Sequence, residues 1–399
     1  MSASRGTPLV AIVKTVSEFC NLRCRYCYYR HLDQSQAHKI MSKAVLRATL
    51  EQIYSWPHGN VSLVWHGGEP LLAKLDFYEY AIAVQETFRH LRPQPILASL
   101  QTNGVLVDRS WAQFFARNRI SVGVSIDGPP EIHDAQRVDA SGHGTFRKVM
   151  RGVDALRAEG LQPGAVCVVH KGNVHAPEQV FDGLLDAGFT RFHFKAMYET
   201  CNGSAVEGSV TGDEYAAFLL RVFRRWAWKD DPNIVIGNFF SILTGLMGGR
   251  PGLCEHAGEC SSFVTIDWDG NIGACDAFPK DTFKFGTVSN GRGVHSYRET
   301  PGFLGFAAGL SQAQEHCHGC EFFNVCAGGC FKYSYDTAAH IWEHSRYCSS
   351  KKVLFQELLQ YSSTGRIEPL DDQATPTLDA QRRMPASDTS HLVQIRPQA

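Results

Sequence analysis

Thirteen cysteines are the feature that most constrains how this 399-residue chain can fold. The first residues hold a short Val and Ile stretch instead of the basic, apolar and small-residue regions of a signal peptide, so we expect a cytoplasmic protein. A reducing compartment disfavours disulfides, which makes metal or iron–sulfur ligation the leading explanation for the cysteines. Their spacing indicates what they bind.

The composition is that of a folded globular protein, with 44% hydrophobic and 20% charged residues. This composition excludes disorder as the main state. The formal net charge of −1 provides no bulk field that would hold a nucleic acid or an anionic membrane. The apolar runs are also too short to cross a bilayer. We therefore expect neither a nucleic acid nor a membrane as a partner.

Predicted strands alternate with helices along the first half of the chain. Apolar periodicity predicts helices at about 42–54, 146–159 and 180–187. The six predicted strands lie at 9–16, 61–65, 96–101, 121–126, 164–169 and 191–196. Six such strand–helix units predict an α/β fold with a parallel sheet.

The loops that leave the carboxyl ends of these strands hold the distinctive residues. Parallel sheets bind their ligands at that edge. The loops are 20–27, 67–70, 102–104 and 127–130. We therefore expect a barrel or partial barrel with its site at this edge.

A change of composition near residue 230 predicts a second domain. After a predicted helix at 213–228, the chain becomes rich in Gly and Cys, with short strands predicted at 262–267 and 285–288. The final residues are polar, contain Pro and Gln, and show no periodicity. The expected division is a barrel at 1–230, a cysteine-rich domain at 231–361 and a flexible tail at 362–399.

The first cysteine set is the run CNLRCRYC, with Cys20, Cys24 and Cys27 in a C-x3-C-x2-C arrangement. One short loop of this kind wraps three thiolates round a metal cluster and leaves one iron without a protein ligand. A structural zinc site normally has four protein ligands, which this loop does not supply by itself. Three unrelated buried cysteines are the alternative.

This loop, with Tyr26 before its last cysteine, resembles the signature of the radical S-adenosylmethionine (SAM) enzymes. The resemblance implies a [4Fe–4S] cluster on the three thiolates, with SAM chelating the fourth iron. One electron then cleaves SAM to a 5′-deoxyadenosyl radical, which abstracts a substrate hydrogen. The motif Gly67-Gly68-Glu69-Pro70 and the run Gln101-Thr102-Asn103-Gly104 agree with it. By the same resemblance, SAM contacts are expected at Tyr26, Gly67, Gly68, Glu69, Ser125 and Arg137.

Eight further cysteines, in the second domain, suffice for two four-thiolate clusters. Their pattern resembles the SPASM auxiliary-cluster domain of peptide-modifying radical SAM enzymes, so three [4Fe–4S] clusters are implied in all. Two zinc sites are the alternative. In the anaerobic sulfatase-maturating branch, the resemblance implies one set of Cys254, Cys260, Cys275 and Cys330, and another of Cys317, Cys320, Cys326 and Cys348. Cys167 and Cys201 lie outside both sets, and we assign them to packing.

A cluster that is bound by four thiolates has no open iron and is suited to electron transfer. The substrate radical that forms after hydrogen abstraction can lose one more electron to such clusters, so we expect a two-electron oxidation of the substrate. Asp276, beside Cys275, resembles the base that deprotonates the substrate Cys or Ser in sulfatase-maturating enzymes. His66 departs from the Gln that is usual in those enzymes, and the segment 277–283 also differs.

The resemblance spans about residues 9–350 and implies a partial (β/α)6 barrel with a SPASM domain. It implies a peptide or protein substrate and a one-electron donor such as flavodoxin or ferredoxin. Because of His66 and 277–283, we slightly favour cross-linking of peptide side chains over formylglycine formation in a sulfatase. A small-molecule alcohol dehydrogenase is a further alternative. A non-catalytic electron carrier is disfavoured, because it needs no three-cysteine loop.

Overall fold

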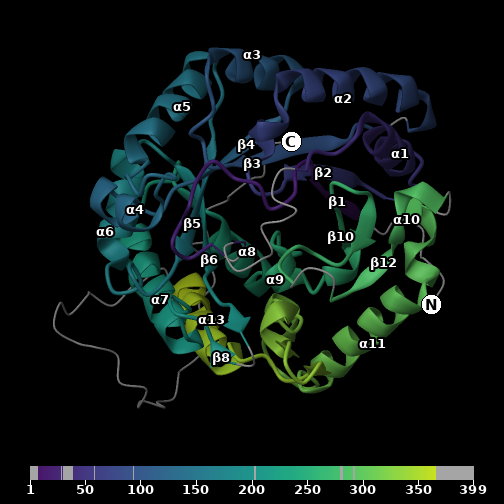
Figure 1. Cartoon of the computed structure of the whole chain (residues 1–399). Helices are drawn as coiled ribbons and strands as arrows, with labels where there is room; N and C mark the ends of the chain where they lie inside the picture. Colours follow the sequence, from purple (N-terminus) through teal and green to yellow (C-terminus); the bar gives the residue numbers. More distant parts are fainter. Residues whose placement is uncertain are drawn as a thin grey trace.

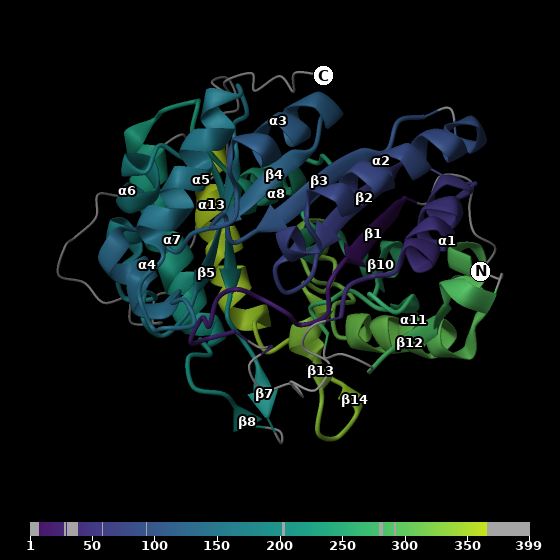
Figure 2. The ribbon, with the colours of Figure 1, turned by 45° about the horizontal axis from the view of Figure 1, so that its top comes forward.

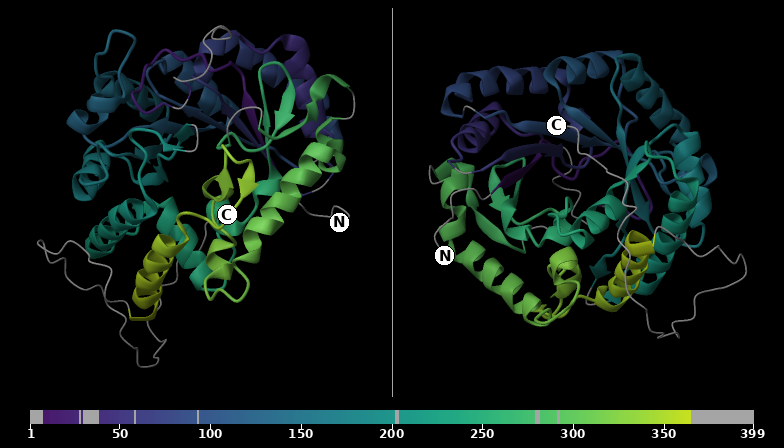
Figure 3. Two further views of the ribbon diagram at one scale, coloured as in Figure 1. Left: turned by 60° about the horizontal axis from the view of Figure 1, so that its bottom comes forward. Right: turned by 180° about the vertical axis from the view of Figure 1, so that it is seen from behind.

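The computed structural model describes residues 8–27, 29, 39–57, 59–92, 94–201, 204–278, 282–290 and 293–364. Its centre is a curved sheet of ten strands, and helices cover the outer side of that sheet (Figure 1). The strands lie in the order β12-β11-β10-β1-β2-β3-β4-β5-β6-β9. Seen from behind, the helices again form a ring round the strands (Figure 3).

Strands β1 to β6 form one parallel series, and β9 extends the series in parallel beside β6. Their bounds are β1 Leu9–Lys14, β2 Val61–His66, β3 Leu97–Thr102, β4 Ser121–Ser125, β5 Gly164–Val169, β6 Arg191–Ala196 and β9 Val235–Ile236. The predicted parallel α/β fold with a partial barrel is confirmed.

The cysteine-rich region continues the same sheet at its other edge. Strand β10 (Phe263–Ile266) pairs in parallel with β1, and β11 (Asn271–Gly273) and β12 (Lys284–Thr287) follow in antiparallel order. The sheet therefore continues across the division expected near residue 230. Two small hairpins project at one end of the molecule (Figure 2). Their strands are β7 Thr200–Cys201, β8 Ser204–Ala205, β13 Tyr335–Asp336 and β14 Ile341–Trp342.

Helices alternate with the strands of the barrel, and further helices surround the cysteine-rich region (Figure 1). The bounds are α1 Lys43–Tyr54, α2 Leu75–Phe88, α3 Arg109–Asn118, α4 Pro130–Gln136, α5 Phe146–Ala158, α6 Pro177–Asp186, α7 Gly212–Lys229, α8 Gly237–Leu246, α9 Cys254–Ala257, α10 Gly293–Ser296, α11 Pro301–Glu315, α12 Phe323–Cys326 and α13 Cys348–Thr364. The 3-10 helices are η3 Pro70–Ala73, η4 Arg89–Leu91, η5 Cys260–Ser262, η6 Val288–Asn290, η7 Tyr297–Glu299 and η8 Phe331–Ser334. No helix of the described residues is long and apolar enough to cross a bilayer.

The two faces of the sheet have different environments. Trp65 of β2 packs edge-on against Tyr78 of α2, and Phe194 of β6 packs against Phe218 of α7. Successive side chains of a strand point to opposite faces, so the neighbours of these aromatic residues face the barrel interior. His66 and Lys195 are such neighbours, and both are partly exposed. Polar side chains therefore line part of the barrel interior.

Most predicted elements match the observed ones within a few residues. The strands predicted at 164–169 and 191–196 match β5 and β6 at both ends. Strand β1 stops at Lys14, two residues before its predicted end, because Val16 instead forms an isolated antiparallel bridge with Ile40. The tail expected from 362 begins inside α13, which ends at Thr364, and 365–399 lie outside the described residues.

Candidate functional site

The loop with the first three cysteines leaves the carboxyl end of β1 and docks along the segment after α4. Leu22 forms an antiparallel bridge with Asp139. The Arg23 amide donates to the Val138 carbonyl at 2.7 Å, and the neighbouring Arg25 amide donates to Gln136 at 2.9 Å. The protein backbone therefore fixes the path of the loop.

The thiols of this loop are held in a partly enclosed environment. Burial, together with the nearby Glu69 carboxylate, raises the pKa of Cys20 to about 12. Burial likewise raises the pKa of Cys24, to about 11. Thiols must lose their protons to bind a metal, so these cysteines stay protonated unless a bound positive centre stabilises the thiolates. The Asn103 side chain also approaches the Cys20 sulfur, at 3.6 Å.

The GGEP motif is hydrogen-bonded to the start of the cysteine loop. The Gly68 amide donates to the Ser17 carbonyl at 3.2 Å, and the Glu69 amide donates to the Phe19 carbonyl at 2.8 Å. A Cβ atom on Gly68 would lie only 2.1 Å from the Phe19 oxygen. Gly67 has a φ of +131°, which favours glycine. Both glycines are therefore needed for the close approach of the two loops.

Glu69 joins the GGEP loop to the loop after β3. Its carboxylate is fully buried and accepts hydrogen bonds from the Leu71 amide, the Thr102 hydroxyl and the Asn103 amide, at 2.8 to 3.1 Å. Burial raises the pKa of Glu69 to about 7, although these three donors favour the charged form. Glu69 thus connects two of the loops that the sequence places at the site.

Tyr26 and Arg137 meet at a carboxylate that the sequence analysis did not select. The Tyr26 hydroxyl donates to Asp127 at 2.7 Å, and the Arg137 guanidinium binds both Asp127 oxygens, at 2.7 and 3.2 Å. Burial would raise the pKa of Asp127, but the Arg137 charge outweighs burial and holds it below its usual range. The position of Asp127 in the loop after β4, at the same edge as the other site residues, was the available signal.

The remaining expected SAM contact, Ser125, lies at the end of β4 and accepts a hydrogen bond from the Gln101 amide at 2.9 Å. Gln101 belongs to β3, so this bond joins neighbouring strands at their carboxyl ends. Beside the cysteine loop, a polar cleft of about 730 Å³ is lined by Tyr26, His170 and Glu207, among others. The structure therefore gathers every expected SAM-contacting residue at one edge of the barrel.

The eight cysteines of the second region fall into two groups in space. The charges of Cys330 and Cys254 add to burial in raising the pKa of Cys260. The charges of Cys254 and Cys260 likewise add to burial and Asp276 in raising the pKa of Cys275. We call Cys254, Cys260, Cys275 and Cys330 the first quartet.

The other four cysteines line a separate small cavity of about 20 Å³. After burial, the charges of Cys326, Cys348 and Cys320 raise the pKa of Cys317. We call Cys317, Cys320, Cys326 and Cys348 the second quartet. The two quartets have the membership that the resemblance implied.

The spacing of the thiols differs from that of a zinc site. In the part of the chain that the structure describes, no three His, Cys, Asp or Glu side chains could hold a single metal ion. An iron–sulfur cluster is larger, and each of its irons binds a different thiolate. A quartet of nearby thiols that do not converge on one point therefore fits a cluster better than one zinc ion.

Asp276 lies beside His66, so the structure joins two residues that the sequence marked separately. The Asp276 Oδ2 atom is 3.3 Å from the His66 Nδ1 atom, although the two are not aligned for a hydrogen bond. Burial lowers the pKa of His66 and would raise that of Asp276, but the charges of His66 and Lys14 hold the Asp276 pKa below its usual range. At pH 7 this arrangement provides a carboxylate beside a mainly neutral imidazole.

The contact depends on the pairing of distant strands. His66 ends β2, beside Lys14 of β1, and β10 pairs with the other side of β1. Asp276 follows β11, which pairs with β10.

Of the two remaining cysteines, Cys167 is fully buried in the core, and the side chain of Cys201 lies outside the described residues.

Comparisons with known proteins agree with this geometry. Residues 15–194 match the model of the radical SAM superfamily. The chain is 30% identical to a serine-type anaerobic sulfatase-maturating enzyme of Bacteroides thetaiotaomicron, over 92% of this chain and 93% of the relative. It is 29% identical to a cysteine-type anaerobic sulfatase-maturating enzyme of Clostridium perfringens, over 88% of this chain and 96% of the relative.

Solved structures extend the likeness to the cysteine-rich region. The structure of anSMEcpe with bound AdoMet and a Cp18Cys peptide aligns with a TM-score of 0.79 and 28% identity, over 88% of this chain and 96% of that one. SuiB of Streptococcus suis, solved with S-adenosylmethionine, aligns with a TM-score of 0.60 over 86% of this chain and 77% of that one. At 14% identity, that likeness shows a shared fold alone. The chain belongs to the radical SAM superfamily and, within it, to the family of the anaerobic sulfatase-maturating enzymes.

Proposed function

We propose that this radical SAM enzyme oxidises a Cys or Ser side chain in a sulfatase-type peptide to formylglycine. The observation that carries the proposal is the placement of Asp276, next to the first quartet and in contact with His66 at the barrel edge. The sulfatase-maturating relatives support it, and they shift the balance away from the cross-linking reaction that His66 and 277–283 favoured.

The cofactors we propose are SAM, one [4Fe–4S] cluster on Cys20, Cys24 and Cys27, and one auxiliary cluster on each quartet. When bound, this set supplies a 5′-deoxyadenosyl radical that takes a hydrogen atom and auxiliary clusters that take an electron. Tyr26, Glu69, Ser125 and Arg137 are the side chains that would orient SAM. We also keep the division at residue 230 and a flavodoxin or ferredoxin donor as proposals.

The protein supplies the proton acceptor for the reaction. Oxidation of the substrate side chain removes a hydrogen atom from its Cβ, a proton from its oxygen or sulfur, and one electron. Asp276, ionised at pH 7, accepts that proton. A Ser substrate gives the aldehyde directly, whereas a Cys substrate gives a carbon–sulfur double bond that water hydrolyses, with release of hydrogen sulfide.

His66 lies beside Asp276 on the barrel side. Its Nδ1 atom faces the Asp276 carboxylate, and Lys14 adds a positive charge nearby. The second candidate function is cross-linking of peptide side chains, and the replacement of the usual Gln by His66 is the observation that favours it.

The test is an anaerobic reaction of the reconstituted enzyme with SAM, reductant and three peptides that differ only in having Cys, Ser or Ala at the target position. We expect an aldehyde-reactive product from the Cys or Ser peptide and none from the Ala peptide. Deoxyadenosine without any change in peptide mass would contradict formylglycine formation and direct the search to a precursor peptide or a small-molecule alcohol.

A further inference from the structure

We propose that Lys351 raises the reduction potential of a cluster at the second quartet, so that the substrate electron moves outward from the first quartet to the second. This inference rests on the proposed function, because it takes clusters at both quartets. It concerns the protein charges between them, which the cysteine pattern does not reveal.

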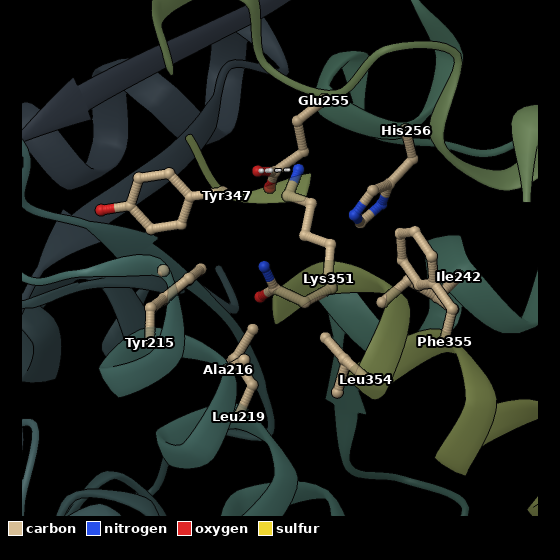
Figure 4. A pocket seen from close by; sticks show the side chains of 12 residues that line it. Tyr215, Ala216, Leu219, Ile242, Glu255, His256, Tyr347, Lys351, Leu354 and Phe355 are labelled. Carbon is tan, nitrogen blue, oxygen red and sulfur yellow. Dashed lines mark ion pairs between the residues drawn. The ribbon is translucent and has the colours of Figure 1, made fainter. Parts of the chain in front are cut away.

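Lys351 is a buried cation that lies between the quartets. Its side chain is only 9% exposed, and its Nζ atom has no hydrogen-bond partner among the described residues. Figure 4 shows it extending from α13 toward Glu255, whose Oε2 atom lies 3.9 Å from Nζ. A buried ammonium without acceptors is costly unless an anion lies nearby.

Glu255 is one such anion, although it makes no hydrogen bond to Lys351, and a cluster at the second quartet would provide another. A Cβ atom on Gly329 would lie 3.3 Å from the Lys351 Nζ and 3.7 Å from the Cys326 sulfur, so the ammonium and the thiol flank the same point. Four thiolates outweigh the positive charge of an iron–sulfur core, so a bound cluster is an anion. The three N–H groups of Lys351 are thus placed to compensate its charge.

The position of Lys351 on its helix supports the same conclusion. Helix α13 begins at Cys348, so Lys351 lies in its first turn. The first turn of a helix carries a partial positive charge that disfavours cations. An anionic cluster on Cys348 and its partners would offset both unfavourable terms, because it lies close to the helix start and to the ammonium.

Glu255 links Lys351 to the first quartet. Glu255 directly follows Cys254 in the chain. Its Oε1 atom is 3.5 Å from Lys195 Nζ and 3.8 Å from His193 Nε2. The Glu255 carboxylate raises the pKa of Lys195, and so do the charges of Cys254 and Cys330. Lys195 therefore lies near the first quartet. Each quartet therefore has a lysine that is paired with Glu255, and these two lysines share its carboxylate.

The two lysines differ in burial, and this difference sets the direction of electron flow. The Lys195 side chain is 41% exposed, whereas that of Lys351 is 9% exposed. Solvent screens an exposed charge, and a buried charge acts more strongly on its neighbours. Reduction adds a negative charge to a cluster, so the buried Lys351 stabilises the reduced second cluster more than Lys195 stabilises the reduced first cluster.

The test is a redox titration followed by electron paramagnetic resonance. It uses full-length reconstituted protein that lacks Cys20, Cys24 and Cys27 (all three changed to Ala), so that only auxiliary clusters contribute. Lys351→Met removes the buried charge at similar side-chain length. Lys352→Met is the matched control for burial, because Lys352 also lines the cavity of the second quartet but is exposed, so solvent screens its charge.

We expect Lys351→Met to lower the reduced-to-oxidised ratio of one cluster about tenfold at a fixed potential. For a one-electron couple this corresponds to a fall of about 59 mV in the reduction potential of that cluster. Lys352→Met should shift the reduction potential far less, and Lys351→Arg should leave the potential close to that of the parent protein. Equal shifts in the Met variants at 351 and 352, or none in either, would overturn the inference.

Two further outcomes separate this inference from the proposed function. A parent protein with no iron in the second region would refute the auxiliary clusters themselves, and the inference with them. If Lys351→Met and Lys351→Gln lose one cluster while Lys351→Arg keeps it, the charge is required for assembly, which supports the role of Lys351. Loss of that cluster in all three variants would indicate a packing role and overturn the inference.

Discussion

The two cysteine regions of this protein differ in how many thiols they supply and in what surrounds them. The loop after β1 has three cysteines and is held by backbone contacts to the GGEP loop and to 136–138. The second region has two groups of four, with buried charged side chains between them. Three thiols leave a cluster one open iron, whereas four enclose it.

This difference separates two tasks. The open site lies where the loops of parallel strands meet, beside Glu69 and Asp127, which position its neighbours. The enclosed sites lie on the side where Lys195, Glu255 and Lys351 supply fixed charges. Under the proposed function, the site that binds SAM and the sites that carry an electron are built from different parts of one chain.

The largest expected effect comes from breaking the open site. Cys24→Ala should abolish SAM cleavage, because two thiolates cannot hold the cluster that cleaves SAM. The measurement is 5′-deoxyadenosine formed anaerobically without a peptide. Cys167→Ala is the control, because this thiol is buried in the core outside all three sets, and it should retain cleavage. Cleavage at the wild-type rate by Cys24→Ala would refute the assignment of this loop.

The next effect sharpens the boundary between the two regions, where Asp276 lies. Asp276→Asn should lower aldehyde formation about 100-fold or more, because a general base typically contributes a factor of that size. Deoxyadenosine should still form. His66→Gln, which introduces the residue usual in relatives, should lower aldehyde formation less. Wild-type aldehyde yields from Asp276→Asn would rule out this residue as the proton acceptor.

The contact between the cysteine loop and the GGEP loop can be tested by a single methyl group. Gly68→Ala should lower the free energy of unfolding by about 3 kcal/mol, because its Cβ would overlap the Phe19 carbonyl. Gly252→Ala is the control, since a Cβ atom there meets no atom within 4 Å. Urea unfolding of both variants checks this. Equal stabilities would show that the two loops are not packed as described.

The smallest expected effect is a pH dependence that belongs to Glu69. Its pKa rises from 4.5 to about 7 on folding, so the folded state binds this proton more tightly than the unfolded state does. The resulting stabilisation is complete below pH 4.5 and is lost as the pH rises through about 7. Between pH 5 and 7.5, wild type should therefore lose about 2 kcal/mol more stability than Glu69→Gln. Parallel urea unfolding curves would contradict a buried, proton-binding Glu69.

Local patterns predicted the fold better than they predicted the site. Strands β5 and β6 were predictable to the residue because β5 is an apolar run and β6 alternates polar with apolar residues, and both are bounded by turn signals. Helix α6 begins at Pro177, three residues before its predicted start, since apolar periodicity overlooks the proline-led first turn. Local patterns of this kind do not report which distant segments meet.

The site residues show the same limit. The cysteine spacing implied the membership of both quartets, and the structure brings the same residues together. The contacts of Asp276 with His66 and of Arg137 with Asp127 were not predicted. The first contact needs β10 to pair with β1 across about 250 residues of chain, which no local periodicity encodes.

The measurement that tests the division of tasks most directly is the ratio of 5′-deoxyadenosine to aldehyde product in one anaerobic reaction, for wild type and for Cys326→Ala. We predict equal amounts of the two products for wild type. For the variant we predict continued SAM cleavage with little or no aldehyde, because the substrate electron has lost its outward path. A folded Cys326→Ala protein that loses both activities to the same extent would contradict an electron-carrying role for the second region.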